Sequence, residues 1–182
     1  MSIDSHEHFG RLSETYGDDY KQIEHKKYPA NRYRLDIIKR LLSDISPDQV
    51  LDVGCGTGVL SILSEKKGAN LIDAIDIEKW CYENTLENLR LNNCKFINVY
   101  HGNINFVNKR KYDIILANIN KNIIMKEIPI YTNSLRTGGQ LIMSGFYDND
   151  FNDINDKAKS LKLNFISKKK KNLWTAIHYL KS

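Results

Sequence analysis

The stretch Val50–Gly58, which reads VLDVGCGTG, limits most strongly what this chain can fold into. A short apolar run, broken only by Asp52, leads directly into three alternating glycines, and an amphipathic run begins at Val59. This order predicts a strand, a tight turn and the start of a helix, because glycine tolerates positive φ and lets a ligand approach the backbone. The turn fits neither the GxGxxG dinucleotide pattern nor the GK[ST] phosphate-binding loop. Since Asp52 would repel a pyrophosphate, the turn favours a ligand with a positive charge or hydroxyl donors.

The composition is that of one globular domain. The chain has 182 residues, of which 41% are hydrophobic and 27% are charged, and this is enough for a substantial core. No apolar run approaches the ~20 residues of a membrane helix, and the N-terminal residues lack the basic-then-apolar pattern of a secretory signal. The three cysteines lack the spacing of a metal site, and His6, His8 and His25 lack a convincing ligand set. We therefore expect no metal and a reduced, cytoplasmic protein.

The basic residues include one conspicuous cluster. The formal net charge is +5, and four lysines form the run Lys168–Lys171. A lysine run can mark a nucleic-acid surface, but no aromatic residues interleave with this one, as a stacking groove for single strands would need. We interpret the run as a solvated loop or strand end, and a nucleic-acid partner is disfavoured.

Strand and helix patterns alternate from the glycine turn onward. Such alternation predicts a mainly parallel sheet with helices on both faces. The predicted strands are Val50–Val53, Leu71–Asp76, Phe96–Tyr100, Tyr112–Ala117, Gln140–Ser144, Asn164–Ser167 and Leu173–Leu180. The predicted helices are Pro29–Ile45, Val59–Lys67, Glu78–Asn92, Ile123–Leu135 and Asp150–Leu161, and Gly138-Gly139 is expected to form a turn.

Two polar residues are expected at the carboxyl ends of predicted strands, where an open α/β sheet presents its ligands. Asp76 follows the glycine turn by roughly 20 positions, and an acidic residue there can accept hydrogen bonds from ribose hydroxyls. The competing carboxylate, Asp73, lies mid-strand, and we assign it a structural or edge role. Asn118 follows the fourth strand, where it could aim a reacting group or cap the next turn.

The string DVGCGTG resembles motif I of the class I S-adenosylmethionine-dependent methyltransferases. From about Val50 to Leu180 the chain resembles the PrmA family, methyltransferases that modify large-subunit ribosomal protein eleven. The strings that carry this likeness are LDVGCGTGVLSIL, AIDIEKWCYENTLENLRLNN, YDIILANINKNI, LRTGGQLIMSGFY and NLWTAIHYL. The resemblance implies an α/β fold with a Rossmann-like, doubly wound sheet of seven strands, mostly parallel with an antiparallel last strand. It also implies S-adenosylmethionine as the cofactor.

The resemblance assigns roles to individual residues as well. The methionine end of the cofactor would lie against Asp52, Gly54, Gly56 and Gly58, and Cys55 of the same turn belongs to the cofactor-binding set. The ribose would bind Asp76, and the adenine would lie against Ile77, Gly102 and Asn103. Asn118 would sit beside the reactive methyl group, where its side-chain carbonyl could accept a hydrogen bond from an amine.

The chain departs from the family at its front. PrmA enzymes carry an N-terminal substrate-recognition domain and a glycine–histidine-rich stretch, and this sequence shows neither. We expect residues 1–182 to form one methyltransferase domain, with a helical lid over 1–49 and a cofactor-binding core over 50–182. Tyr16, Tyr28 and Arg32 are candidates to close over the cofactor; the alternative is that they are surface side chains that pack a terminal helix.

The leading functional hypothesis is an N-methyltransferase that acts on a protein amine. The alternative is a small-molecule methyltransferase, which the missing recognition domain favours. An RNA or DNA methyltransferase is disfavoured, because Asn118 is followed by Ile-Asn-Lys and not by the Pro-Pro-aromatic sequence of base-amine methyltransferases. A cofactor-binding module without activity would keep the same glycine turn and Asp76, so a turnover assay has to separate it from an enzyme.

Overall fold

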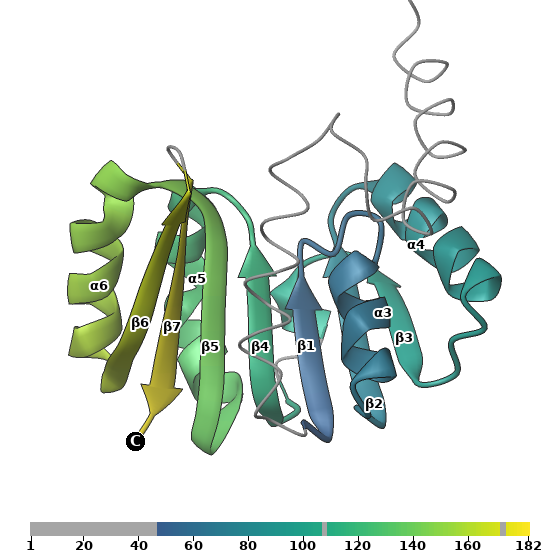
Figure 1. The fold of residues 1–182 in the computed structure, drawn as a ribbon, viewed down its shortest axis with the longest axis horizontal. Coiled ribbons are helices and arrows are strands. Elements are labelled where there is room, and N and C mark those ends of the chain that lie inside the picture. Colours follow the sequence, from purple (N-terminus) through teal and green to yellow (C-terminus); the bar gives the residue numbers. More distant parts are fainter. Residues whose placement is uncertain (1–46, 107–108, 172–173) are drawn as a thin grey trace, which may run out of the picture.

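The computed structural model describes residues 47–106, 109–171 and 174–182, so most of the predicted lid lies outside the described residues. The described chain forms one seven-stranded sheet with the order β3-β2-β1-β4-β5-β7-β6 (Figure 1). The strands are β1 (Gln49–Val53), β2 (Leu71–Asp76), β3 (Ile97–His101), β4 (Tyr112–Asn118), β5 (Leu135–Tyr147), β6 (Leu163–Lys171) and β7 (Trp174–Lys181). Neighbours are parallel except where β7 pairs with β5 and β6. The predicted sheet with an antiparallel last strand is confirmed.

Helices connect the strands and cover both faces of the sheet (Figure 1). They are α3 (Val59–Lys66), α4 (Lys79–Leu91), α5 (Lys121–Ser134) and α6 (Phe151–Ser160), with short 3-10 turns η1 (Ile104–Phe106) and η2 (Asp148–Asp150). Side chains of α3 pack with one face of the central strands, and side chains of α5 and α6 pack with the other. Successive strand residues point to opposite faces, so β1 and β4 contribute to both cores. Burial on both faces explains why these strands read as nearly continuous apolar runs.

The mid-strand carboxylate of Asp73 has the structural role that we assigned to it. Asp73 is fully buried, and it accepts hydrogen bonds from the Arg110 guanidinium at 2.7 and 2.8 Å and from the Tyr112 hydroxyl at 2.7 Å. A buried carboxylate needs such partners, because an unpaired buried charge strongly destabilises a fold. Asp73 therefore ties β2 to the beginning of β4 and is not part of the ligand edge.

Strand β5 is longer than the sequence predicted. It begins at Leu135, directly after α5, and Gly138 and Gly139 lie inside it. The prediction of a separate turn there is wrong. The pairing with β4 shifts between Leu135 and Gln140, so the intervening residues bulge from the sheet, and Gly138 has a φ of +75°. Glycine supplies the positive φ that such a bulge needs.

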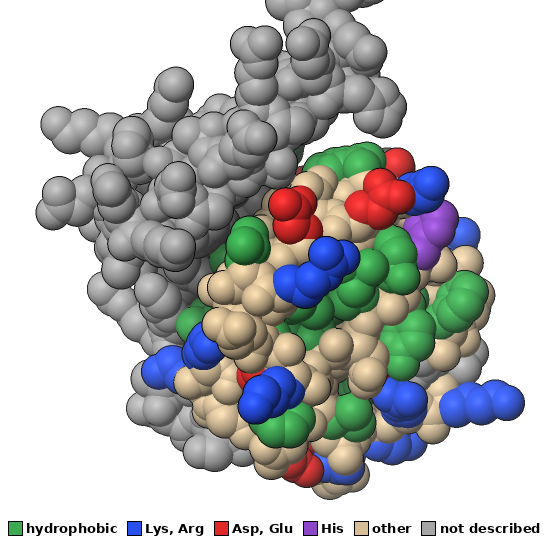
Figure 2. Space-filling model, turned by 90° about the vertical axis from the view of Figure 1, so that its right-hand side faces the viewer, with side chains coloured by type: hydrophobic (Ala, Val, Ile, Leu, Met, Phe, Trp, Pro, Cys, Tyr) green, Lys and Arg blue, Asp and Glu red, His purple; other side chains and the backbone are tan. Residues whose placement is uncertain are grey.

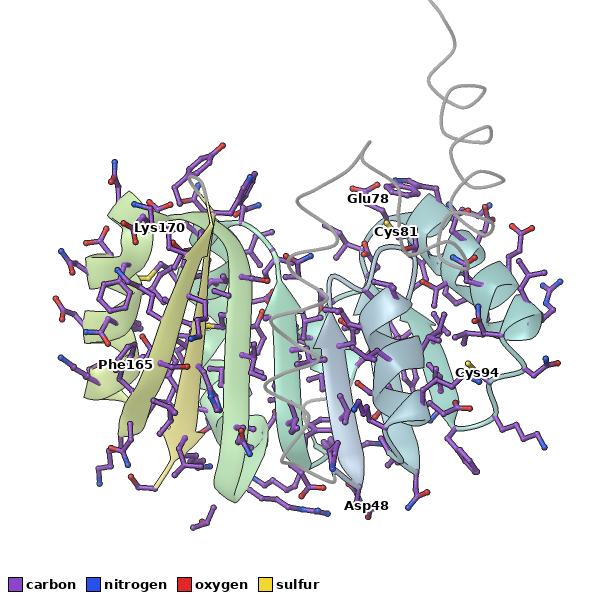
Figure 3. The ribbon with its side chains drawn as sticks, viewed as in Figure 1. Asp48, Glu78, Cys81, Cys94, Phe165 and Lys170 are labelled. Carbon is purple, nitrogen blue, oxygen red and sulfur yellow. The ribbon has the colours of Figure 1, made fainter. Side chains whose placement is uncertain are left out.

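The lysine run forms the end of β6, which agrees with its interpretation as a strand end and not with that as a loop. The ammonium groups of Lys168 and Lys170 lie 3.0 and 2.8 Å from the carboxylate of Asp148. Figure 3 labels Lys170 at the end of β6 where β7 begins. β6 is an edge strand of the sheet, and lysines on an edge oppose pairing with a second chain. The run therefore has a structural explanation that needs no nucleic acid.

The opposite edge strand, β3, has a different character. Residues 97–101 contain no lysine, arginine or carboxylate, and the large hydrophobic side chains of Ile77, Phe96 and Phe106 are exposed near it. Figure 2 shows hydrophobic side chains gathered on this face between lysine and arginine residues.

Within the described ranges, no helix is long and apolar enough to cross a membrane.

Candidate functional site

The glycine turn at the carboxyl end of β1 is built on three positive φ angles. Gly54, Gly56 and Gly58 have φ values of +67°, +59° and +76°. A Cβ atom on Gly54 would collide with the side chain of Ile119, and one on Gly58 would lie 2.7 Å from Cγ2 of Thr85. At Gly56 a Cβ would meet no atom of the described residues within 4 Å. Two of the glycines are therefore required by the protein's own packing, whereas no residue in the described part of the chain fills the space at Gly56, where a ligand can approach.

Two side chains of helix α4 donate hydrogen bonds to the backbone of this turn. The Thr85 hydroxyl donates to the carbonyl of Gly56 at 3.0 Å, and the Asn88 side-chain amide donates to the carbonyl of Thr57 at 2.9 Å. Thr85 and Asn88 lie three positions apart, which places them on one face of the helix. Neither residue was predicted from the sequence, because their partners in the turn lie 29 and 31 positions away along the chain.

Asp76 joins the glycine turn to the end of β2. Its Oδ2 accepts a hydrogen bond from the Gly56 amide at 2.9 Å, and its Oδ1 accepts one from the Glu78 amide at 3.0 Å. The Cys81 thiol contacts the same carboxylate, and burial, followed by the charge of Asp76, raises the pKa of Cys81 to about 12. Figure 3 shows Glu78 and Cys81 at the edge of the sheet where the parallel strands end. A carboxylate has about four acceptor positions, so Asp76 keeps capacity for hydroxyl donors of a ligand.

The residues expected near an adenine also meet at this edge. Ile77 is 60% exposed, and the Gly102 amide donates to the carbonyl of Asp76 at 2.8 Å. The side chain of Asn103 accepts a hydrogen bond from the Asn105 amide at 3.0 Å, which fixes the turn that follows. Phe106, which the sequence analysis did not select, lies with its ring against Gly102 and is 66% exposed.

Two members of the predicted cofactor set do not face the open side of the turn. Asp52 is fully buried, and it accepts hydrogen bonds from the Ser61 amide at 3.1 Å and from the Ser61 hydroxyl at 2.5 Å. Burial raises the pKa of Asp52 to about 6. The buried Cys55 thiol lies 3.5 Å from the Thr85 hydroxyl, and burial raises its pKa as well. The structure therefore buries both side chains, that of Asp52 against Ser61 of α3 and that of Cys55 against Thr85 of α4.

Asn118 ends β4 directly beside the glycine turn. Its side-chain carbonyl accepts a hydrogen bond from the Ser144 hydroxyl at 3.0 Å, and the next residue, Ile119, contacts Gly54. The capping role that we considered for Asn118 belongs to Asn120, whose side chain accepts from the Ile123 amide at the start of α5. Asn118 is therefore a half-buried amide at the edge where the cofactor turn also lies.

The remaining candidates, Tyr16, Tyr28 and Arg32, lie outside the described residues. Among the residues that are described, no three His, Cys, Asp or Glu side chains form a group that could hold a metal ion. The site thus consists of an open glycine turn, a carboxylate fixed by backbone amides, exposed apolar side chains and an oriented amide. Such a surface can bind a cofactor with hydroxyl and apolar groups and can present a hydrogen-bond acceptor to a second substrate.

The family model and the curated relatives agree on one family. A sequence model described as "Ribosomal protein L11 methyltransferase (PrmA)" matches residues 30–182. The ribosomal protein L11 methyltransferase of Phocaeicola vulgatus is 42% identical over 146 residues, which are 79% of this chain and 52% of the relative. The enzyme of the same name from Porphyromonas gingivalis is 39% identical over 137 residues, which are 75% of this chain and 47% of the relative. The chain therefore spans about half the length of these curated relatives.

A solved structure extends this agreement to the fold. The crystal structure of the ribosomal protein L11 methylase from Lactobacillus delbrueckii subsp. bulgaricus is 26% identical and superposes with a TM-score of 0.77. The superposition covers 86% of this chain and 81% of that chain. The glycine turn, Asp76 and Asn118 all lie within the residues that the family model matches. The chain belongs to the PrmA family of ribosomal protein L11 methyltransferases.

Proposed function

We propose that this chain is an S-adenosylmethionine-dependent methyltransferase that transfers a methyl group to an amine of a protein. The observation that carries the proposal is the position of Asp76, whose carboxylate is fixed by two backbone amides beside the open side of Gly56. A carboxylate in that position suits ribose hydroxyls. The family relationship supports the same cofactor, and the relatives' names point to ribosomal protein L11 as the acceptor.

The residues present fit this cofactor. Gly56 leaves room for a ligand against the backbone, Asp76 has free acceptor positions, and Ile77 and Phe106 offer apolar surface for a base. When bound, S-adenosylmethionine supplies a methyl group on a sulfonium cation. The protein then has to hold the acceptor beside it, and correct positioning of two reactants can lower a barrier by roughly 7–11 kcal/mol.

Asn118 is the residue that we assign to the acceptor. A carbonyl oxygen accepts two hydrogen bonds, and the Ser144 hydroxyl occupies one position on Oδ1 of Asn118. The second position can accept an N–H of a neutral amine and so aim its lone pair. The amine has to arrive unprotonated, and both desolvation and a nearby cation lower the pKa of an amine.

Several expectations from the sequence stay predictions. They are the division into a lid over 1–49 and a core over 50–182, the closing role of Tyr16, Tyr28 and Arg32, and a cytoplasmic location. The relatives do not favour the alternative of a small-molecule acceptor, because they are named as methyltransferases of a ribosomal protein.

The direct test combines binding and transfer. We expect calorimetry to show saturable binding of S-adenosylmethionine, and we expect tritium from its labelled methyl group to appear in recombinant ribosomal protein L11. Asp76→Ala should weaken cofactor binding about 10- to 100-fold, since each lost hydrogen bond to a charged acceptor contributes roughly 1.5–3 kcal/mol. Circular dichroism has to show that the variant is folded. Unchanged affinity in a folded variant would remove Asp76 from the site, and label confined to an RNA or metabolite fraction would overturn the protein acceptor.

A further inference from the structure

Asn118 and Ser144 are register partners at the ends of β4 and β5, which lie side by side in the sheet (Figure 1). Ser144 is only 5% exposed, and its hydroxyl donates to Oδ1 of Asn118 at 3.0 Å. Its backbone carbonyl accepts a hydrogen bond from the Ile119 amide, also at 3.0 Å. Ser144 therefore binds the segment that carries Asn118 through both its main chain and its side chain.

A bulge in β5 holds Ser144 in this place. The pairing of β5 with β7 shifts between Ser144 and Phe146, and Gly145 between them has a φ of +98°. A Cβ on Gly145 would lie 2.6 Å from the carbonyl oxygen of Ile119. The missing side chain thus lets β5 approach the backbone that follows Asn118. Because backbone geometry fixes Ser144, its hydroxyl donates to the Asn118 side-chain amide from a fixed position.

The Ser144 hydroxyl donates to the carbonyl end of the Asn118 amide, which fixes the direction of both ends of that amide. The carbonyl end of an amide accepts hydrogen bonds, whereas the NH₂ end only donates them. An amine that is to attack a methyl group needs its lone pair free and can offer an N–H to an acceptor. If the amide were reversed, its NH₂ group would compete for that lone pair.

We propose that Ser144 is a positioning residue for methyl transfer, whose hydroxyl keeps the Asn118 carbonyl oriented to accept an N–H of the acceptor amine. This inference rests on the proposed function of the same site. It assigns Ser144 no contact with the substrate or the cofactor. It therefore requires that every catalytic effect of the hydroxyl pass through Asn118.

The main variant is Ser144→Ala, with Ser134→Ala as a matched control. Ser134 is also buried, but its hydroxyl has no hydrogen-bond partner among the described residues. With tritiated S-adenosylmethionine and ribosomal protein L11, we expect Ser144→Ala to lower kcat about tenfold, a 1.4 kcal/mol effect in line with one hydrogen bond. The Kd for S-adenosylmethionine should stay within about twofold, because positioning, not cofactor binding, is lost. Ser134→Ala should keep the wild-type kcat.

Two further variants separate orientation from packing. Ser144→Thr retains the hydroxyl and should recover most of the activity. Ser144→Cys keeps a side chain of similar size with a much weaker donor, and it should resemble Ser144→Ala. In the double variant with Asn118→Ala, removal of the Ser144 hydroxyl should add no further loss. The proposal would be overturned if the loss of kcat in the double variant equalled the product of the two single losses. Full activity in a folded Ser144→Ala protein would overturn it as well.

A measurement without turnover keeps this inference distinct from the proposed function. Nitrogen relaxation of the Asn118 side-chain amide, assigned by its disappearance in Asn118→Ala, should report a rigid group in the wild type and a mobile one in Ser144→Ala. An equally rigid amide in both proteins would refute the orienting role. If the wild type transfers no methyl group to ribosomal protein L11 while the relaxation result holds, the acceptor assignment fails and the orientation by Ser144 stands.

Discussion

At the scale of single residues, Gly56 and Gly68 form a natural pair for comparison. Both have positive φ, +59° and +99°, and at both a Cβ would have no neighbour within 4 Å in the ranges that the structure describes. Gly68 follows the C-terminal end of helix α3, whereas the glycine turn precedes its N-terminal end. Substitution by alanine should lower the free energy of unfolding by a similar amount at the two positions, on the order of 1 kcal/mol.

Only Gly56→Ala should affect the cofactor. Its new methyl group would enter the space that the described residues leave unfilled at the turn, so we expect S-adenosylmethionine to bind at least tenfold more weakly, whereas Gly68→Ala should bind normally. Calorimetry on both variants, with chemical denaturation to compare stabilities, makes the measurement. Equal affinities in the two variants would mean that the ligand does not approach the turn at Gly56.

Asp52 gives the fold a specific pH dependence. Its pKa is about 6 in the folded chain against 3.8 when exposed, because burial disfavours the charged carboxylate. Between these values the native state holds a proton that the unfolded chain has released. The stabilising contribution is therefore complete below pH ~3.8 and is lost as the pH rises through ~6, a change on the order of 3 kcal/mol.

Asp52→Asn should remove this dependence while the Asn carbonyl still accepts from Ser61. Thermal unfolding of both proteins without cofactor, from pH 4 to pH 7, provides the test. We expect the midpoint of the variant to rise relative to that of the wild type as the pH increases across this range. Parallel curves would show that Asp52 is already ionised at pH 4.

At the scale of elements, α4 is more than a connector between β2 and β3. Its first turn begins beside Asp76, and its buried side reaches the glycine turn through Thr85 and Asn88. Both parts of the cofactor site, the glycine turn and Asp76, are thus hydrogen-bonded to α4 or to its N-cap residue, Glu78.

Thr85→Val tests this support, because valine keeps the shape and removes the hydroxyl. The carbonyl of Gly56 would lose its donor, so we expect a stability loss of roughly 1–3 kcal/mol and cofactor binding about 3- to 10-fold weaker. Thr132→Val is the control, since the buried Thr132 hydroxyl donates only to the carbonyl of Ile128 within α5. If both variants bound the cofactor like the wild type, the turn would hold its shape without α4.

The sequence predicted the elements well where a pattern is local. Period and glycine placement located β1, α3 and β2 within about two residues, and Asp76 follows from its position at a strand end. The long β5 and β6 could not be predicted in the same way. Gly138-Gly139 has the composition of a turn, and it lies inside β5 because the residues on either side of it, Leu135 and Gln140, pair with β4. The roles of Ser144 and Thr85 depend on contacts across 26 and 29 positions, which no local pattern encodes.

At the scale of the whole molecule, the central strands that carry the glycine turn and Asn118 are more deeply buried than the edge strand β3. β1 and β4 are adjacent at the middle of the sheet and almost fully buried, whereas β3 is an edge with half-exposed side chains. We expect amide hydrogen exchange to be slowest in β1 and β4 and fastest, among the parallel strands, in β3. Exchange measured by mass spectrometry on overlapping peptides would show this order. Protection in β3 equal to that in β4 would indicate that the β3 edge is covered in solution.

The strand order has a further consequence for a chain that is being synthesised. β7 lies between β5 and β6, although it follows both of them along the chain. As a nascent chain leaves the ribosome, β6 has no neighbour to join until Trp174–Lys181 has emerged, and β5 waits with one side unpaired. The Asn118–Ser144 contact needs nothing beyond β5. The part of the sheet that carries Asn118 can therefore pair before β7 has been synthesised, whereas β6 can join the sheet only after β7 is in place.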